Sequence, residues 1–208
     1  MNRFLRFLGA LLPCAGDWWE SEIVGVCRHG APWGSNGFPT QPVNAYSNVA
    51  YPAVGWGVFA ITATPESIAF ALTMTALGVG SFLYHAWPTV KTAKYDHAGM
   101  YAVFLALTTY AVGAPAWAMW VSAGVGAYLF RYAFHMNLNV MMGLFLWLSG
   151  IAVFSSGDRA LGTASGACFV TAMLAWQLDR HRVLTGRYGH GIWHVLTALA
   201  IGLMFLGV

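Results

Sequence analysis

Seven long apolar segments constrain the fold of this chain more than any other feature. They cover roughly residues 43–63, 66–87, 95–113, 115–134, 138–155, 160–178 and 189–208. A helix needs about 20 mostly apolar residues to cross a membrane. Only 8% of the residues are charged, against about 25% in a soluble domain. The sequence therefore predicts an all-α, polytopic membrane protein, in which residues 1–208 form a single seven-transmembrane helix bundle.

The basic residues fall almost entirely on one side of this predicted bundle. Nine of the ten Lys and Arg residues lie on the side that carries the N-terminus, and Arg159 alone lies on the other. Cytoplasmic loops of membrane proteins are enriched in Lys and Arg. We therefore expect the protein to lie in a membrane such as the bacterial inner membrane, with its N-terminus on the cytoplasmic side. No basic run or stripe is present, which argues against nucleic-acid binding.

The chain before the first apolar segment divides into two parts. Residues 1–13 begin with Arg3 and Arg6 among apolar residues, a pattern typical of an interfacial helix. Residues 14–41 are rich in Gly, Pro, Trp and acidic residues, and we expect them to form a structured N-terminal loop. A disulfide between Cys14 and Cys27 is conceivable only on an oxidising side of the membrane.

Three histidines are predicted to meet at one membrane depth. His190 and His194 are four residues apart at the start of the last apolar segment, so they share one helix face. His85 ends the second segment on the same side of the bundle. Three nitrogen ligands and one open position form a catalytic zinc site. Gly191 stands where zinc proteases of the H-E-x-x-H type carry their base. Two further interpretations stay open, namely interfacial histidines and bis-histidine haem binding.

The base is expected from the third apolar segment, which opens with "KYDHAGM". Asp96 lies at or just inside the membrane boundary on the histidine side, and an ionisable residue there indicates a functional site. Its alternative role is that of an interfacial aspartate paired with Lys94 or with a helix N-terminus. Ser81 lies four residues before His85 on the same face and could stabilise an oxyanion. His97 points away from Asp96 around the helix, so we expect it to be structural.

Two further polar clusters precede these residues. Asn44, Ser47 and Asn48 form a seam on the first apolar segment, and such residues usually hydrogen bond to neighbouring helices. In the N-terminal loop, the sequence "DWWESE" places three carboxylates within six residues. They form either a solvated acidic turn or an oxygen-ligand site for Ca²⁺.

The ordered motifs resemble those of a known family. The sequences "DWWESE", "NAYSN", "SFLYH", "YDH" and "HGIWH" occur in this order over nearly the whole chain. Together they resemble the alkaline ceramidases and the wider CREST superfamily of seven-span, hydrolase-like membrane proteins, which includes the adiponectin receptors. The motifs S-x-x-x-H, D and H-x-x-x-H, in this order, are similar to those of the superfamily. The acidic loop and the N-x-x-S-N element are similar to the ceramidase branch.

The resemblance implies a role for each matching residue. His85, His190 and His194 would bind Zn²⁺, Asp96 would be the general base and acid, and Ser81 would assist at the oxyanion. A Ca²⁺ site would comprise Asp17, the carbonyl of Trp18, Glu20, Glu22 and Gln41. Glu22 replaces an Asn of the family and Gln41 replaces a Glu, so the number of carboxylates is unchanged.

The sequence and the resemblance together predict a zinc-dependent amidohydrolase. Its substrate would be a ceramide-type lipid, entering from the bilayer and cleaved at the N-acyl amide to a fatty acid and a sphingoid base. One alternative is a related lipid hydrolase with another N-acyl or ester substrate. Another is a receptor or sensor in which zinc is structural.

Overall fold

A computed structural model describes residues 41–87, 90–133, 157–180 and 188–208. Throughout these ranges the regular structure is helical and no strand is present, which confirms the all-α prediction. The N-terminal segment 1–40, with its predicted loop, calcium ligands and disulfide, lies outside the described residues. So does the predicted helix at 138–155.

The helices fall on six of the seven predicted apolar segments. Their bounds are α3 Pro42–Ser47, α4 Ala50–Thr62, α5 Pro65–Ala86, α6 Val90–Ala111, α7 Ala116–Ala133, α9 Arg159–Arg180 and α10 Gly189–Gly207. Within the described residues, the first segment is predicted as a single helix but forms two helices, α3 and α4, and α6 begins at Val90 rather than at the predicted residue 95.

Pro52 explains this break. The backbone carbonyl of Asn48 would normally accept from the residue four positions on, but proline has no N–H to donate. That carbonyl instead accepts from the N–H of Tyr51 at 3.2 Å. The N–H of Val49 likewise donates to Tyr46, three residues back, at 3.2 Å. The chain therefore forms a tighter turn, with hydrogen bonds between residues three apart, between α3 and α4.

The start of α5 is fixed by its own side chains. Thr64 and Ser67 form a capping box, in which the Ser67 N–H donates to Thr64 Oγ1 at 3.2 Å and the Thr64 N–H donates to Ser67 Oγ at 2.9 Å. Pro65 occupies the first helical position, where its missing N–H costs nothing. These features set where α5 begins, and α5 then runs to Ala86, one residue beyond His85.

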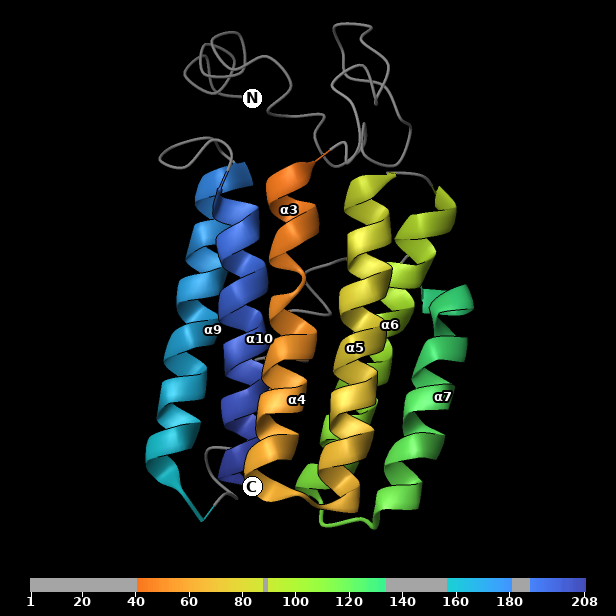
Figure 1. Cartoon of the computed structure of the whole chain (residues 1–208), viewed down its shortest axis with the longest axis vertical. Helices are drawn as coiled ribbons and strands as arrows, with labels where there is room; N and C mark the ends of the chain where they lie inside the picture. Colours follow the sequence, from red (N-terminus) through yellow and green to blue (C-terminus); the bar gives the residue numbers. More distant parts are fainter. Residues whose placement is uncertain (1–40, 88–89, 134–156, 181–187) are drawn as a thin grey trace, which may run out of the picture.

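The helices lie side by side with their long axes roughly parallel (Figure 1). α10 packs against the sequence-distant helices α3 and α4, while α5 packs against α3 and against its chain neighbours α4 and α6. The core includes a stack of aromatic rings from three helices. Phe205 of α10 lies 4.5 Å from Phe70 of α5 and 4.1 Å from Tyr110 of α6, measured between ring centroids. Both phenylalanines are fully buried, so the stack joins α10 to the other half of the bundle.

One end of the bundle collects the starts of α3, α6 and α10 and the ends of α5 and α9, and α7 runs towards this end (Figure 1). Side chains from α3, α5, α6 and α10 at this end form the candidate site. We call it the histidine end of the bundle.

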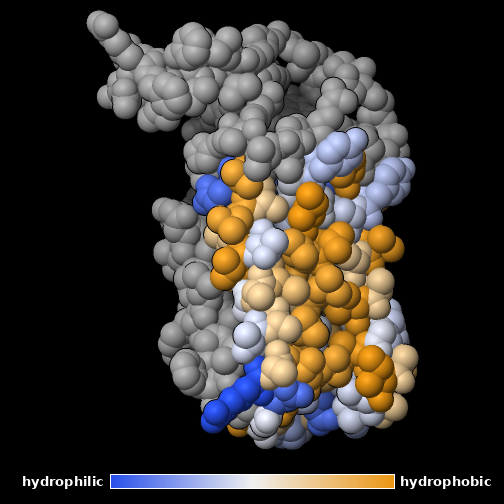
Figure 2. All heavy atoms as spheres, turned by 90° about the vertical axis from the view of Figure 1, so that its left-hand side faces the viewer, coloured by the Kyte–Doolittle hydropathy of each residue, from blue (hydrophilic) through white to orange (hydrophobic). Residues whose placement is uncertain are grey.

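Three helices within the described residues are long and apolar enough to cross a membrane, namely Pro65–Ala86, Arg159–Leu178 and Gly189–Gly207. Large apolar side chains are exposed along them, including Val170 and Leu174 of α9 and Leu199 of α10. Figure 2 shows such a surface on the α9 side, with apolar atoms over the middle and hydrophilic atoms towards the ends. This distribution suits contact with lipid rather than with water.

Candidate metal centre

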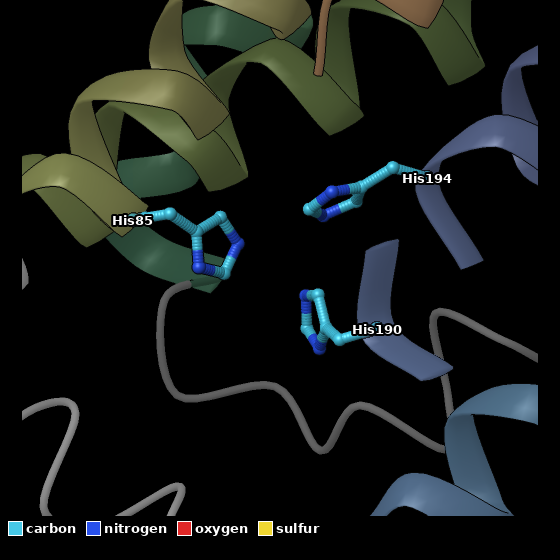
Figure 3. A group of neighbouring side chains, drawn as sticks. All are labelled: His85, His190 and His194. Carbon is cyan, nitrogen blue, oxygen red and sulfur yellow. The ribbon is translucent and has the colours of Figure 1, made fainter. Parts of the chain in front are cut away.

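Three imidazoles from two helices converge at the histidine end. His85 lies in the last turn of α5, while His190 and His194 lie in the first two turns of α10. Their side chains face a common space (Figure 3). All three residues are buried, with exposed fractions of 2%, 5% and 3%. The prediction that these histidines meet is therefore confirmed.

The spacing of the three rings suits a single metal ion. One nitrogen of each histidine lies within 4.8 Å of the others. The ring centroids are 4.8 Å apart for His85 and His190, 5.0 Å for His85 and His194, and 4.7 Å for His190 and His194. With zinc–nitrogen bonds of about 2.0–2.1 Å, three imidazoles arranged tetrahedrally around one ion have ring centres about 5 Å apart. The residues present are therefore compatible with zinc.

Two of the three imidazole rings contact a polar side chain through Nδ1. His85 Nδ1 lies 2.6 Å from Gln41 Oε1, and His194 Nδ1 lies 2.8 Å from Ser47 Oγ. Both contacts are within hydrogen-bond distance. The seam residue Ser47 thus bonds across to a neighbouring helix, as predicted.

The other two seam residues bond within their own segment. Asn48 Nδ2 donates to the backbone carbonyl of Asn44 at 2.8 Å, and Asn44 Nδ2 donates to Gln41 Oε1 at 3.0 Å. Both asparagines are buried. Their side chains stabilise the α3 segment locally, and the seam joins α3 to α10 through Ser47 and through a hydrogen bond between the Asn44 backbone and His194.

Asp96 lies beside Ser81, and a hydrogen bond joins their side chains. Ser81 is buried on α5, one turn before His85, and residues four apart on a helix lie about 5–6 Å apart. Asp96 lies in the second turn of α6 and is half-buried. The carboxylate therefore reaches the layer of the bundle that holds the histidines. His97 is near enough to interact electrostatically with Asp96.

A glycine makes the contact between Ser81 and Asp96 feasible. A Cβ atom on Gly80 would lie 2.6 Å from the backbone carbonyl oxygen of Tyr95 and 3.2 Å from the backbone nitrogen of Asp96. Only glycine permits so close a crossing of α5 and α6. Ser81 follows Gly80 and Asp96 follows Tyr95, so the hydrogen bond between Ser81 and Asp96 spans this crossing.

Tyr51 closes the site on the α4 side. Its ring centroid lies 6.0 Å from that of His194, and its hydroxyl lies 2.8 Å from Thr197 Oγ1. Neither Tyr51 nor Thr197 was predicted from the sequence. Thr197 follows His194 by three residues and so shares its helix face, which is the one signal that could have indicated it.

Most of the predicted calcium ligands cannot be placed beside this site. Asp17, Trp18, Glu20 and Glu22 lie outside the described residues. Gln41 is described, and its side-chain oxygen contacts His85 Nδ1 and Asn44 Nδ2. Its contact with His85 was not predicted.

Cys168 lies half-buried on α9 as a free thiol.

Comparison with protein-family models finds no match, and a search of curated protein sequences finds none either. The functional assignment therefore depends on the site itself and on the motifs of the sequence.

Proposed function

We propose that this chain is a zinc hydrolase of the membrane that cleaves the N-acyl amide of ceramide-type lipids, with His85, His190 and His194 as zinc ligands. The observation that carries the proposal is a group of three convergent, buried imidazoles with a hydrogen-bonded Ser81–Asp96 pair one helical turn from His85. Within the described part of the chain, no fourth Cys, His, Asp or Glu joins the three histidines. Three protein ligands leave one position open for water or substrate, which is typical of catalytic zinc.

The surrounding residues suit acid–base chemistry on an amide. Bound here, zinc would make water more acidic and polarise the substrate carbonyl. Asp96 accepts the proton of the attacking water and returns it to the leaving amine. Ser81 donates its hydroxyl proton to Asp96 at first. Once Asp96 carries a proton it no longer requires this donor, and Ser81 can donate to the substrate oxyanion instead.

The membrane arrangement is also part of the proposal. We take α3 and α4 together as one span, add α6, α7 and the segment 138–155, and so extend the three candidate spans to seven. Lys91, Lys94, Arg131 and Arg180 belong to the histidine end and Arg159 to the other. This supports a cytoplasmic histidine end in a bacterial inner membrane. The substrate would enter sideways from the lipid.

The choice of substrate rests on the sequence motifs. The resemblance of "DWWESE", "NAYSN", "SFLYH", "YDH" and "HGIWH" to alkaline ceramidases supports an N-acyl sphingoid lipid. The site itself suits any acyl lipid with a scissile carbonyl. A panel of purified ceramides, other N-acyl amines and ester lipids separates these substrates directly.

The decisive experiment replaces Asp96 in the detergent-purified protein. Asp96→Asn should keep the zinc content of the wild type yet lower lipid hydrolysis by about 10²–10⁴-fold, because a general acid–base residue contributes that much. Asp158→Asn is the matched control. Asp158 caps α9 by accepting from the N–H groups of Ala160 and Leu161 at 2.9 and 3.1 Å, and asparagine caps equally well.

Three outcomes would contradict the proposal. Full hydrolysis by Asp96→Asn would exclude Asp96 as the base. Zinc in the wild type without cleavage of any lipid in the panel would favour a receptor or sensor with structural zinc. A Soret band in the purified protein would indicate haem bound by the histidines instead.

A further inference from the structure

Two of the proposed zinc ligands are each held by a side chain of the same short segment. We propose that Gln41 and Ser47 are positioning residues of the metal centre: each accepts a hydrogen bond from Nδ1–H of its histidine and so leaves Nε2 as the metal-binding nitrogen. The inference rests on the proposed zinc site, and it adds which nitrogen binds and what selects it. Metal-ligating histidines commonly donate their second ring N–H in this way.

The hydroxyl of Ser47 determines the tautomer of His194. A serine has one proton to donate, and Ser47 Oγ donates it to the backbone carbonyl of Asn44 at 2.9 Å. With that proton on the Asn44 carbonyl, the contact of 2.8 Å between Ser47 Oγ and His194 Nδ1 is donated by the histidine, which also hydrogen bonds to the backbone of Asn44. His194 Nδ1 therefore carries the ring proton, and Nε2 keeps the lone pair that a metal requires.

Gln41 does the same for His85, with a second contact in addition. Its Oε1 is an acceptor, and it receives Asn44 Nδ2 at 3.0 Å as well as His85 Nδ1 at 2.6 Å. The backbone N–H of Gln41 donates to the backbone carbonyl of His85 at 3.1 Å. Main chain and side chain of one residue thus hold the backbone and the ring of His85 together.

The position of α3 explains how one segment reaches two ligands on different helices. Gln41 is the residue before α3 and Ser47 is its last residue. The segment packs against both α5 and α10. Gly191 allows the close approach, because a Cβ there would lie 2.9 Å from Val43 Cγ1 and 3.5 Å from Ser47 Oγ. A glycine between the two α10 histidines therefore makes room for the partner of His194.

Both acceptors are neutral, which makes the inference sharply testable at Gln41. A carboxylate partner raises the basicity of a ligating imidazole more than an amide does. Gln41→Glu keeps an acceptor at the same reach and adds a charge, whereas Gln41→Leu removes the acceptor at similar volume. Zinc affinity should therefore fall in the order Gln41→Glu, wild type, Gln41→Leu.

The experiment measures zinc affinity of the full-length protein in detergent by competition with a chromophoric chelator. Gln41→Leu and Ser47→Ala should each weaken zinc binding about 10–100-fold. They should also shift the visible absorption of the Co²⁺-substituted protein, because the rings reorient. Gln177→Leu and Ser122→Ala are matched controls. Ser122 Oγ also donates to a carbonyl three residues back, that of Met119, at 2.9 Å, and both controls should leave zinc affinity unchanged.

The outcomes separate this inference from the proposed function. If the wild type binds zinc and the Leu and Ala variants bind it equally tightly, with an unchanged cobalt spectrum, the positioning role is wrong and the zinc site stands. If the wild type binds no zinc, both fail. Should Gln41→Leu not fold, Gln41→Glu still decides, since weaker zinc binding by that variant than by the wild type would contradict the expected order of affinities.

Discussion

Replacing Gly80 by alanine tests whether the close crossing of α5 and α6 holds the Ser81–Asp96 pair together. The added Cβ would lie 2.6 Å from the carbonyl oxygen of Tyr95, and an ordinary contact begins near 3.4 Å, so the helices must separate by roughly 0.8 Å. The obstacle is backbone, which cannot rotate away. Overpacking of this kind costs about 1–3 kcal/mol of stability, and a misplacement near 1 Å can cost about 10²-fold in rate.

The assay compares Gly80→Ala with Gly57→Ala by unfolding in detergent, zinc content and lipid hydrolysis. Nothing lies within 4 Å of a Cβ on Gly57. Gly57→Ala should therefore gain about 0.5–1 kcal/mol from helix propensity alone and keep its rate. Gly80→Ala receives the same propensity gain but should be less stable than Gly57→Ala by the packing cost, and it should keep zinc while hydrolysis falls. Equal stability and equal rate in the two variants would refute the reasoning.

Two further predictions concern the histidines and Tyr51. We expect about one zinc ion per wild-type chain, and His190→Ala should lose it. Removing zinc from the wild type with a chelator should lower its unfolding temperature, and adding zinc back should restore the original unfolding temperature. Elemental analysis and a thermal scan check this, and zinc retained at full occupancy in His190→Ala would contradict it. Tyr51→Phe should cost about 0.6 kcal/mol, the typical value of an interhelical hydrogen bond in a membrane. A double-mutant cycle with Thr197→Val measures that coupling, and a coupling near zero would show that the bond of 2.8 Å contributes nothing.

The sequence was sufficient to predict the parts of the site that depend on helix geometry. The spacing of His190 and His194 fixes them on one face of α10, and the alternating direction of the segments brings His85 to the same end. Asp96 follows by the same reasoning, because α6 begins where α5 ends. These inferences need the period of a helix and a count of segments, and both can be read from the apolar pattern.

The sequence was not sufficient for contacts that depend on how closely two helices approach. Gln41 and His85 are far apart in the chain, and nothing in "TQPVNAY" shows that an amide there reaches an imidazole. The break between α3 and α4 was missed for a different reason. The apolar segment continues beyond residues 48 and 49 to residue 63, and the missing N–H of Pro52 acts on a carbonyl one turn earlier. The apolar pattern alone does not show that a single backbone N–H donor is missing.

The distribution of the three histidines along the chain has a consequence for how the protein is made. His85 lies in α5 and the other two lie in α10, more than a hundred residues later and in the last helix that the structure describes. During synthesis the N-terminal helices are available first, and a lone imidazole holds a divalent ion poorly. Metal capture must therefore wait until α10 has docked beside α3. An ion bound there would tie α5 to α10, so that metal occupancy reports that these two helices have docked.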